Sequence, residues 1–123
     1  MPQTFAPPSI VPPVGGYYHG VLAQPFLFVS GQTPERPDGT ISSDPEQQLR
    51  QIWSNIAAVL AAADMELQHL VHVRTYLADR SLREVNTAVR RDVLGDHRPA
   101  LTVVICELFE PTWVAEIEAV AAR

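Results

Sequence analysis

The chain has 123 residues, of which 46% are hydrophobic, which is enough for one domain with a buried core. Its net charge is −5 and its nine basic residues are all arginines scattered along the chain, so nucleic-acid binding, which needs clustered basic side chains, is disfavoured. Cys106 is the only cysteine, which excludes an intrachain disulfide and a cysteine-based metal cluster, and no apolar run approaches the roughly 18 residues of a membrane-spanning helix.

The first residues form a proline-rich segment. Residues 1–14 have the composition of an extended lead-in, and they lack the basic start and apolar run of a signal peptide. We therefore expect a single domain over residues 1–123 and a cytoplasmic location. A β-rich run follows, and a turn signal at 24–25 predicts a hairpin with strands near 17–23 and 26–31.

A helix is predicted over residues 44–63. Asp44 suits the N-cap, Pro45 suits the first helical position, and Gln47 is placed to complete a capping box. The apolar residues that then recur at helical spacing are Leu49, Ile52, Trp53, Ile56, Val59 and Leu60. This stripe predicts that the helix packs one face against a sheet.

Residues 70–77 alternate as a strand does. One face carries Val71, Val73, Thr75 and Leu77, and the other carries His72, Arg74 and Tyr76. Ser81 and Glu84 then form a second capping-box pattern, which predicts a helix that ends at Gly95.

Two more strands are expected at 101–108 and 113–121. The predicted order is β-β-α-β-α-β-β, which is typical of an α+β domain with two helices on one face of a mixed sheet. The apolar side chains of 101–108 cannot all face helices, so part of the other face should be apolar. Because a large exposed apolar surface usually marks a partner, the sequence predicts an oligomer.

The sequence resembles the Rid (YjgF-like) family in six short motifs that occur in the same order. They lie at residues 15–21, 28–32, 55–56, 85–86, 99–102 and 116–119, and they resemble the family's G-P-Y-S-Q-A-V opening, V-S-G-Q, N-I, V-N, P-A-R-[ST] and closing E-I-E-A. Each motif is weak alone, but six in order over nearly the whole chain are specific.

This resemblance implies a chorismate-mutase-like (YjgF-like) α+β fold, a homotrimer, and small-molecule clefts between subunits. It also implies cofactor-free hydrolysis of reactive enamines and imines to a keto acid and ammonia. In the family's deaminases, the arginine of P-A-R-[ST] pairs with the substrate carboxylate. The first glutamate of E-I-E-A helps to position or activate water.

Four residues of this chain match the family's site. Glu116 matches the glutamate and is the candidate catalytic residue, while Tyr17, Ser30 and Gly31 match residues that shape the cleft. A carboxylate in an apolar cleft has a raised pKa and can act as a general base or acid. The alternative for Glu116 is a solvated or ion-paired strand residue, and the alternative for Tyr17 is strand packing.

Four positions depart from the family's pattern. Leu101 replaces the arginine, Gly16 a proline, Tyr18 a small polar residue and His19 a glutamine. Leucine cannot reproduce a bidentate arginine–carboxylate contact, so we expect 2-iminoacids to be poor ligands. Leu101 and Val103 share a strand face, and we expect them to form an apolar wall of the pocket opposite the catalytic glutamate.

Three further side chains are candidates for ligand binding. Arg74 or Arg98 could supply a displaced guanidinium, with an ordinary surface or inter-subunit arginine as the alternative. His19 could transfer a proton near neutral pH, or it could be a hydrogen-bonded structural residue. The four histidines lack metal-ligand spacing, so no metal site is expected.

Two functions remain open on this basis. The first is a cofactor-free hydrolase or deaminase of an enamine or imine, in which Glu116 directs water and the substrate range differs from that of 2-iminoacid deaminases. The second is a non-catalytic trimer that binds a small molecule, such as a sensor or pathway accessory protein, which Leu101 favours because it removes the main substrate anchor. Ribonuclease activity, a third label in this family, is disfavoured by the acidic charge.

Overall fold

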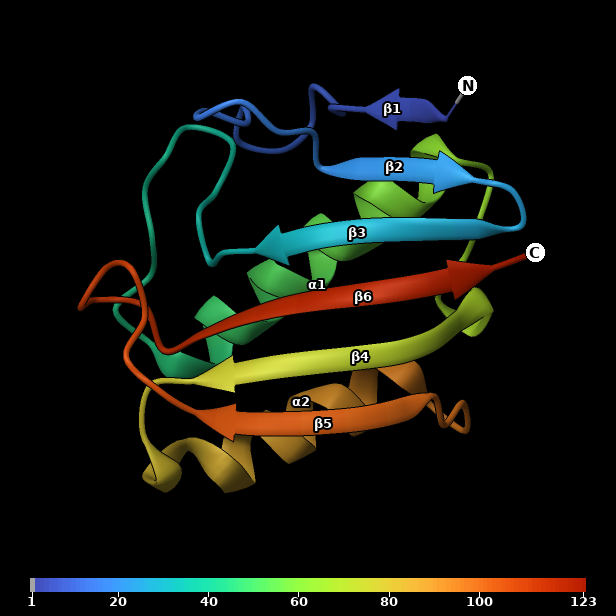
Figure 1. Cartoon of the computed structure of the whole chain (residues 1–123). Coiled ribbons are helices and arrows are strands. Elements are labelled where there is room, and N and C mark those ends of the chain that lie inside the picture. The colour runs from blue at the N-terminus through green and yellow to red at the C-terminus, as the bar shows by residue number, and fades with distance from the viewer. Residues whose placement is uncertain (1) are drawn as a thin grey trace.

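The computed structural model describes residues 2–123 and shows one six-stranded sheet with two helices (Figure 1). The elements in chain order are β1 (Gln3–Phe5), β2 (Gly20–Ala23), β3 (Phe26–Gln32), α1 (Pro45–Ala62), β4 (Leu70–Leu77), α2 (Arg83–Leu94), β5 (Ala100–Ile105) and β6 (Ala115–Ala122). Short 3-10 turns precede β4 and α2. The predicted α+β class, with its mixed sheet and two helices, is confirmed.

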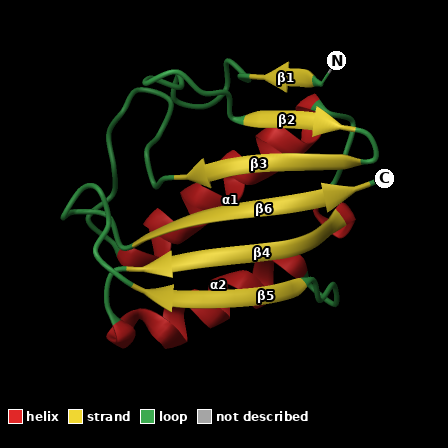
Figure 2. Ribbon diagram, viewed as in Figure 1, coloured by secondary structure: helices red, strands yellow, loops and turns green. Residues whose placement is uncertain are grey.

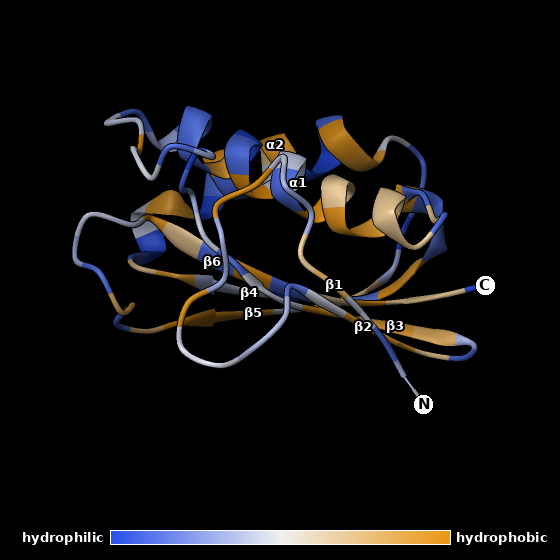
Figure 3. Cartoon of the chain, turned by 90° about the horizontal axis from the view of Figure 1, so that it is seen from above, coloured by the Kyte–Doolittle hydropathy of each residue, from blue (hydrophilic) through white to orange (hydrophobic). Residues whose placement is uncertain are grey.

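The last strand lies in the middle of the sheet. The strand order is β1-β2-β3-β6-β4-β5, so β6 is inserted between β3 and β4. Only β4 and β5 run parallel, and the other neighbours are antiparallel. Both helices cover the same face of this sheet, as Figures 2 and 3 show. The other face carries no helix, and the side chains of β6 that point to it start at Glu116.

The core fills the space between the helices and the sheet. The fully buried side chains of α1 include Leu49, Ile52, Ile56 and Leu60, which are the residues of the predicted stripe. Trp53 is also almost fully buried. The inward side chains of β6 alternate with its outward ones, and three of them are alanines, which lets the helical layer approach the centre of the sheet.

The lead-in contains a strand that the sequence did not predict. Thr4 of β1 pairs with Val21 of β2, so part of the predicted extended segment 1–14 completes the edge of the sheet. Three residues are too few to show a periodic pattern, and the segment gains its partner only when β2 is in place. The remaining seven elements follow the predicted order.

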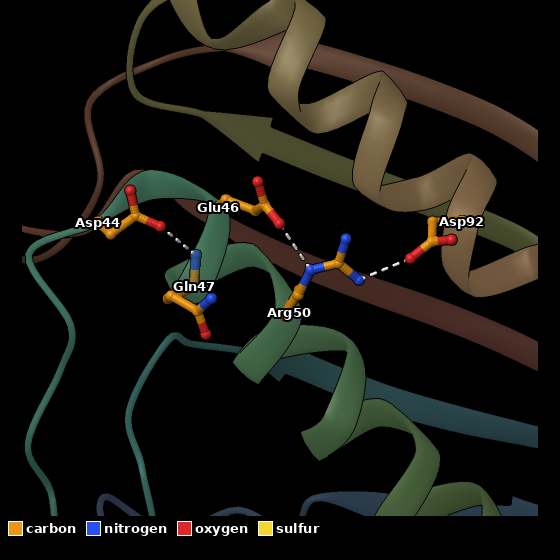
Figure 4. Close-up of polar contacts among 5 residues, drawn as sticks. All are labelled: Asp44, Glu46, Gln47, Arg50 and Asp92. Carbon is orange, nitrogen blue, oxygen red and sulfur yellow. Dashed lines mark hydrogen bonds and ion pairs between the residues drawn. The ribbon is translucent and has the colours of Figure 1, made fainter.

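The start of α1 depends on polar contacts that Figure 4 shows. The Asp44 carboxylate accepts a hydrogen bond from the Gln47 N–H at 3.0 Å, as the sequence predicts for an N-cap. The return half of the predicted capping box is missing, because the Asp44 N–H donates to the Ser42 hydroxyl. Arg50 then pairs with Glu46 on its own helix and with Asp92 on α2, at 3.0 and 2.8 Å (Figure 4).

The second helix starts differently from the prediction. The Asp79 carboxylate accepts a hydrogen bond from the Ser81 N–H and starts a 3-10 turn, and α2 begins only at Arg83. The predicted box between Ser81 and Glu84 is therefore wrong. Asp79 replaces Ser81 as the capping residue, because its carboxylate accepts the Ser81 N–H and starts the 3-10 turn before α2. Gly95 ends α2 with a positive φ, as predicted.

Strand β5 forms one edge of the sheet and all six of its residues are exposed. Leu101 and Val103 lie beside Val73 and Thr75 of β4 in parallel register, so they point to the helical side, yet each is 41% exposed. On the opposite, helix-free face, large hydrophobic side chains are also exposed, and Phe28 is half exposed. Figure 3 shows β5 as a hydrophobic strand.

None of the helices in residues 2–123 has the length and apolar character needed to cross a membrane.

Candidate functional site

The candidate site lies where the pairing between β3 and β6 shifts register. The ladder runs regularly through Val29 and Ala119, and it resumes at Gln32 and Ile117. The irregularity contains Ser30 and Gly31. Gly31 is needed there, because a Cβ at this position would overlap Oε2 of Glu116 and lie 3.0 Å from its carboxyl carbon. The Glu116 carboxylate therefore rests on the backbone of β3.

Glu116 is half-buried on the helix-free face. Burial raises the pKa of its carboxyl, and repulsion from Glu118 raises this pKa further. A carboxylate with a raised pKa is a stronger base than an ordinary surface glutamate. A raised pKa is what general-base or general-acid catalysis by a carboxyl group would use, and the catalytic role of Glu116 stays a prediction.

An open hollow of about 800 Å³ lies on one side of Glu116 and is called the Glu116 hollow below. Its walls are formed by Val11, Pro12, Val14, Tyr17, His19, Ser30, Gly31, Gln32, Thr33, Glu35, Phe109, Glu110, Trp113 and Glu116. The walls are apolar and aromatic apart from backbone groups, a few uncharged polar side chains and three carboxylates. No arginine is among these described lining residues. The hollow should therefore favour neutral or cationic ligands over anions.

Tyr17 supplies a phenol to this hollow. Burial raises the pKa of Tyr17, and the nearby Glu35 and Glu116 carboxylates raise it further. The phenol therefore keeps its proton and can donate a hydrogen bond. Its ring stands edge-on to His19, with the ring centroids 5.9 Å apart.

His19 lies inside the protein and connects two segments of the wall. It is 3% exposed, its Nε2 lies 2.7 Å from the Val11 carbonyl, and its Nδ1 lies 3.1 Å from Nε2 of Gln32. The Val11 carbonyl can only accept and the Gln32 amide can donate, so the ring can donate from Nε2 and accept at Nδ1. Within one chain, His19 holds the proline-rich segment against β3. A role of His19 in proton transfer stays a prediction.

The loop after β3 is held by a helix residue. The buried Asn55 of α1 donates from Nδ2 to the carbonyls of Thr33 and Glu35, each at 3.1 Å. Ser30 donates from its hydroxyl to the Tyr18 carbonyl at 2.6 Å, which ties the segment before β2 to the irregularity. Ser30 and Asn55 therefore act on the shape of the hollow through the backbone.

Arg74 is on the face of β4 opposite Val73, as predicted, and this is the helix-free face of the sheet, where Arg74 is already paired. Its guanidinium lies 3.4 Å from the Glu118 carboxylate, and the Tyr76 hydroxyl donates to the same oxygen. Neighbouring Tyr76 and then Glu118 raise the pKa of Arg74. Its role as a replacement for the missing arginine stays a prediction.

Leu101 and Val103 are not near Glu116 within one chain. They point to the helical side of β5, whereas Glu116 points to the helix-free side of β6. Leu101 instead lines a small hollow with arginines of α2 and the loop that follows it. The predicted shared wall therefore needs a second chain, and it stays a prediction.

Sequence reasoning missed several lining residues of the Glu116 hollow, among them Glu35, Phe109 and Glu110. Glu35 and Glu110 lie in loops without a motif, so no signal marked them. Phe109 is 89% exposed, and its exposure beside Glu116 is not visible in the alternation of the strands. Trp113 precedes β6 and also lines the hollow.

Comparison with known proteins relates the chain to one family. The family model described as Endoribonuclease L-PSP matches residues 9–123. A RutC family protein of Pyrococcus horikoshii is 32% identical over 113 residues, which cover 90% of this chain and 90% of that protein. A RutC family protein of Aquifex aeolicus is 31% identical over 120 residues, which cover 94% and 95% of the two chains.

Solved structures share the whole architecture. The YjgF gene product of E. coli matches with a TM-score of 0.93 at 26% identity, covering 98% of each chain. RidA of the Antarctic bacterium Psychrobacter matches with a TM-score of 0.93 at 26% identity, covering 98% of this chain and 99% of that one. The predicted YjgF-like fold is confirmed.

Proposed function

Because the chain belongs to the Endoribonuclease L-PSP family, to which the RutC, YjgF and RidA proteins are related, we propose that it hydrolyses an enamine or imine without a cofactor. Its substrates would differ from those of 2-iminoacid deaminases. The observation that carries this proposal is the half-buried Glu116, whose pKa is raised and whose carboxylate rests on Gly31 beside an apolar hollow.

The proposed reaction uses Glu116 as a general base. Its carboxylate accepts a proton from water while the water oxygen attacks the imine carbon, which forms a carbinolamine. The carbinolamine is neutral because the imine nitrogen enters protonated. Glu116 then returns the proton to this nitrogen. As the C–N bond breaks and ammonia leaves, the Glu116 carboxylate takes the hydroxyl proton, the carbonyl forms, and this proton passes to solvent. One water is consumed, and no oxidant or reductant is required. An enamine would first take a proton on carbon to become the imine.

The charge of the hollow suits the reactive form of an imine. A protonated imine is cationic and more electrophilic than the neutral form, and the carboxylates of Glu35, Glu110 and Glu116 would attract it. The Tyr17 phenol would orient the substrate by a hydrogen bond. The same carboxylates would repel phosphates, so we do not propose RNA cleavage for this chain.

The proposal includes a homotrimer with a ligand between subunits. Strand β5 and the helix-free face expose apolar side chains in the single chain, which supports their contact with other copies. A neighbouring chain would bring Leu101 and Val103 to the Glu116 hollow as an apolar wall. That wall would favour substrates that need no carboxylate anchor.

The test compares wild type with Glu116→Gln on a panel of imines and enamines with and without a carboxylate. Loss of the base should lower kcat by about 10²- to 10⁴-fold. Wild-type activity should fall as the pH drops through the raised pKa of Glu116, because only the carboxylate accepts a proton. Glu84→Gln, at an exposed position of α2, is the control and should keep full activity. Equal turnover by wild type and Glu116→Gln would exclude this mechanism.

The second candidate is a binding protein without catalysis. The absence of arginine among the described lining residues supports it, since the main substrate anchor of the family's deaminases is missing. A metabolite screen by thermal shift tests it, because a ligand that binds only the folded protein raises Tm. A ligand that raises Tm and is recovered unchanged would favour this function over hydrolysis.

A further inference from the structure

A second hollow lies between the end of α2 and the start of β5. Figure 1 shows β5 at the edge of the sheet, with α2 beside it. It has a volume of about 150 Å³ and is called the Arg90 hollow below. Its walls are Arg90, Arg91, Leu94, His97, Arg98, Pro99 and Leu101. Three of the nine arginines of an otherwise acidic chain meet here, and no carboxylate is among these lining residues.

The Arg90 guanidinium has one N–H group without a hydrogen-bond acceptor among the described residues. Its Nη1 is buried, and it has no hydrogen-bond partner within residues 2–123. Burial lowers the pKa of Arg90, and repulsion from Arg91 and Arg98 lowers it further. A buried donor of a charged group is costly without an acceptor, so an anion in this hollow would remove both the missing bond and the repulsion.

The remaining walls are fixed by hydrogen bonds to the backbone. Arg98 donates from Nη1 to the carbonyls of Gly95 and His97, which keeps its guanidinium at the hollow. His97 in turn has its Nε2 2.7 Å from the Leu70 carbonyl, which ties the loop to β4. Arg98 and His97 are thus held in place before a ligand arrives, which lowers the entropic cost of binding.

We propose that the Arg90 hollow binds a small oxyanion, namely the phosphate or carboxylate group of a metabolite. Guanidinium groups are planar forks that match both kinds of oxyanion, and several can share one. The volume suits a single such group, while Leu101 and Pro99 give an apolar wall for the carbon attached to it. Within one chain, the acidic Glu116 hollow and this basic one share no lining residue. The anion-binding proposal rests on the arginines of the Arg90 hollow, so it does not depend on hydrolysis at Glu116, even where Leu101 also contacts the Glu116 hollow of a neighbouring chain.

The test is a titration of the full chain with inorganic phosphate and, separately, with succinate. Binding is followed by isothermal calorimetry and by NMR of the arginine side-chain N–H groups, with chloride held at matched ionic strength. We expect saturable shifts of the Arg90, Arg91 and Arg98 signals. A stronger response to phosphate or to succinate identifies the preferred oxyanion.

Two variants and a matched control locate the site. Arg90→Gln should weaken the anion affinity by about 30-fold or more, because it removes the guanidinium whose buried Nη1 would donate to the bound anion. Arg98→Gln lies at an exposed position and should weaken it about threefold without disturbing the fold. Arg83→Gln, exposed at the first turn of the same helix, loses the same charge and should bind as wild type does.

Three results would overturn the proposal. One is the absence of a saturable response to both anions in the wild type. Another is an equal loss of affinity in Arg83→Gln and Arg98→Gln, which would indicate only general attraction by charge. The third is a change of assembly in Arg90→Gln with unchanged anion binding, which would mean that a carboxylate of another chain fills the hollow. Glu116→Gln should bind the anion normally whether or not the wild type hydrolyses imines.

Discussion

At the scale of single residues, the position of the Glu116 carboxylate depends on the absence of a side chain at Gly31. Any side chain at Gly31 would occupy the space of the carboxyl group. The φ of Gly31 is not among the positive values of the chain, so the backbone itself would accept alanine. Glycine is therefore required at this position to leave space for the Glu116 carboxylate, and not for the backbone conformation of the irregularity in β3.

We predict that Gly31→Ala keeps the fold and loses the function of Glu116. The new methyl group displaces the end of a flexible side chain, so the free energy of unfolding should change by less than about 1 kcal/mol. Turnover of an imine should fall by roughly tenfold to a hundredfold, because the base is misplaced. The double variant with Glu116→Gln serves as the control, and it should be no slower than Glu116→Gln alone. Fully additive losses would show that the two residues act separately.

A second residue-scale prediction concerns pH. The folded protein raises the pKa of Glu116, so it binds this proton more tightly than the unfolded chain does. The stability that protonation gives is complete below the unfolded pKa, and it is lost as pH rises through the folded pKa. Wild type should therefore lose stability relative to Glu116→Gln as pH rises from acidic to neutral. Urea unfolding of both proteins over this range measures the difference, and a difference that is constant with pH would contradict the raised pKa.

At the scale of elements, an aspartate caps the start of each helical segment, but only the cap of α1 could be predicted from the sequence. Asp44 directly caps α1, whereas Asp79 caps a 3-10 turn that leads into α2. Arg50 joins the helices through exposed ion pairs, which contribute little in water (Figure 4). The cap should therefore matter more to stability than the charges beside it.

We predict that Asp44→Ala lowers the free energy of unfolding by about 1 kcal/mol, because the Gln47 N–H loses its acceptor. Glu46→Ala removes a neighbouring carboxylate that makes only an exposed pair with Arg50, so it is the matched control. Its cost should stay below about 0.5 kcal/mol. Urea unfolding checks both values, and an equal cost for the two variants would contradict the role of the cap.

The elements also show which features the sequence could predict. The stripe of α1 and the alternation of β4 from Val73 to Leu77 determine which faces are buried, so both were predictable. The prediction for Val71 was wrong: it is 44% exposed, because the pairing of β4 with β6 shifts register between Leu70 and His72. Strand β1 was not, because its three residues form a strand only through pairing with β2. In the site, Glu116 and Gly31 could be found from motifs, but their contact could not, since it depends on the shifted register between β3 and β6. Glu35 required the tertiary structure, because Asn55 holds its loop.

At the scale of the whole molecule, the exposed apolar side chains lead to a prediction about assembly. We expect the wild type to be a trimer, with a solution mass three times that of one chain. Phe28→Asp should shift it to the monomer, because it places a charge among the apolar side chains of the helix-free face. Ala61→Asp introduces the same charge on the exposed surface of α1 and should stay trimeric. Light scattering after size exclusion measures the mass, and a monomeric wild type would contradict the proposal.

The edge position of β5 has a consequence for hydrogen exchange. Its residues are exposed and it pairs only with β4, so half of its amides point away from the sheet. In an isolated chain these amides would exchange with deuterium within seconds, while those of the central β6 would wait for global opening. If other copies cover the edge, the exchange of β5 would slow as the protein concentration rises. One strand would then report the association of the chains in a measurement that needs no variant and no ligand.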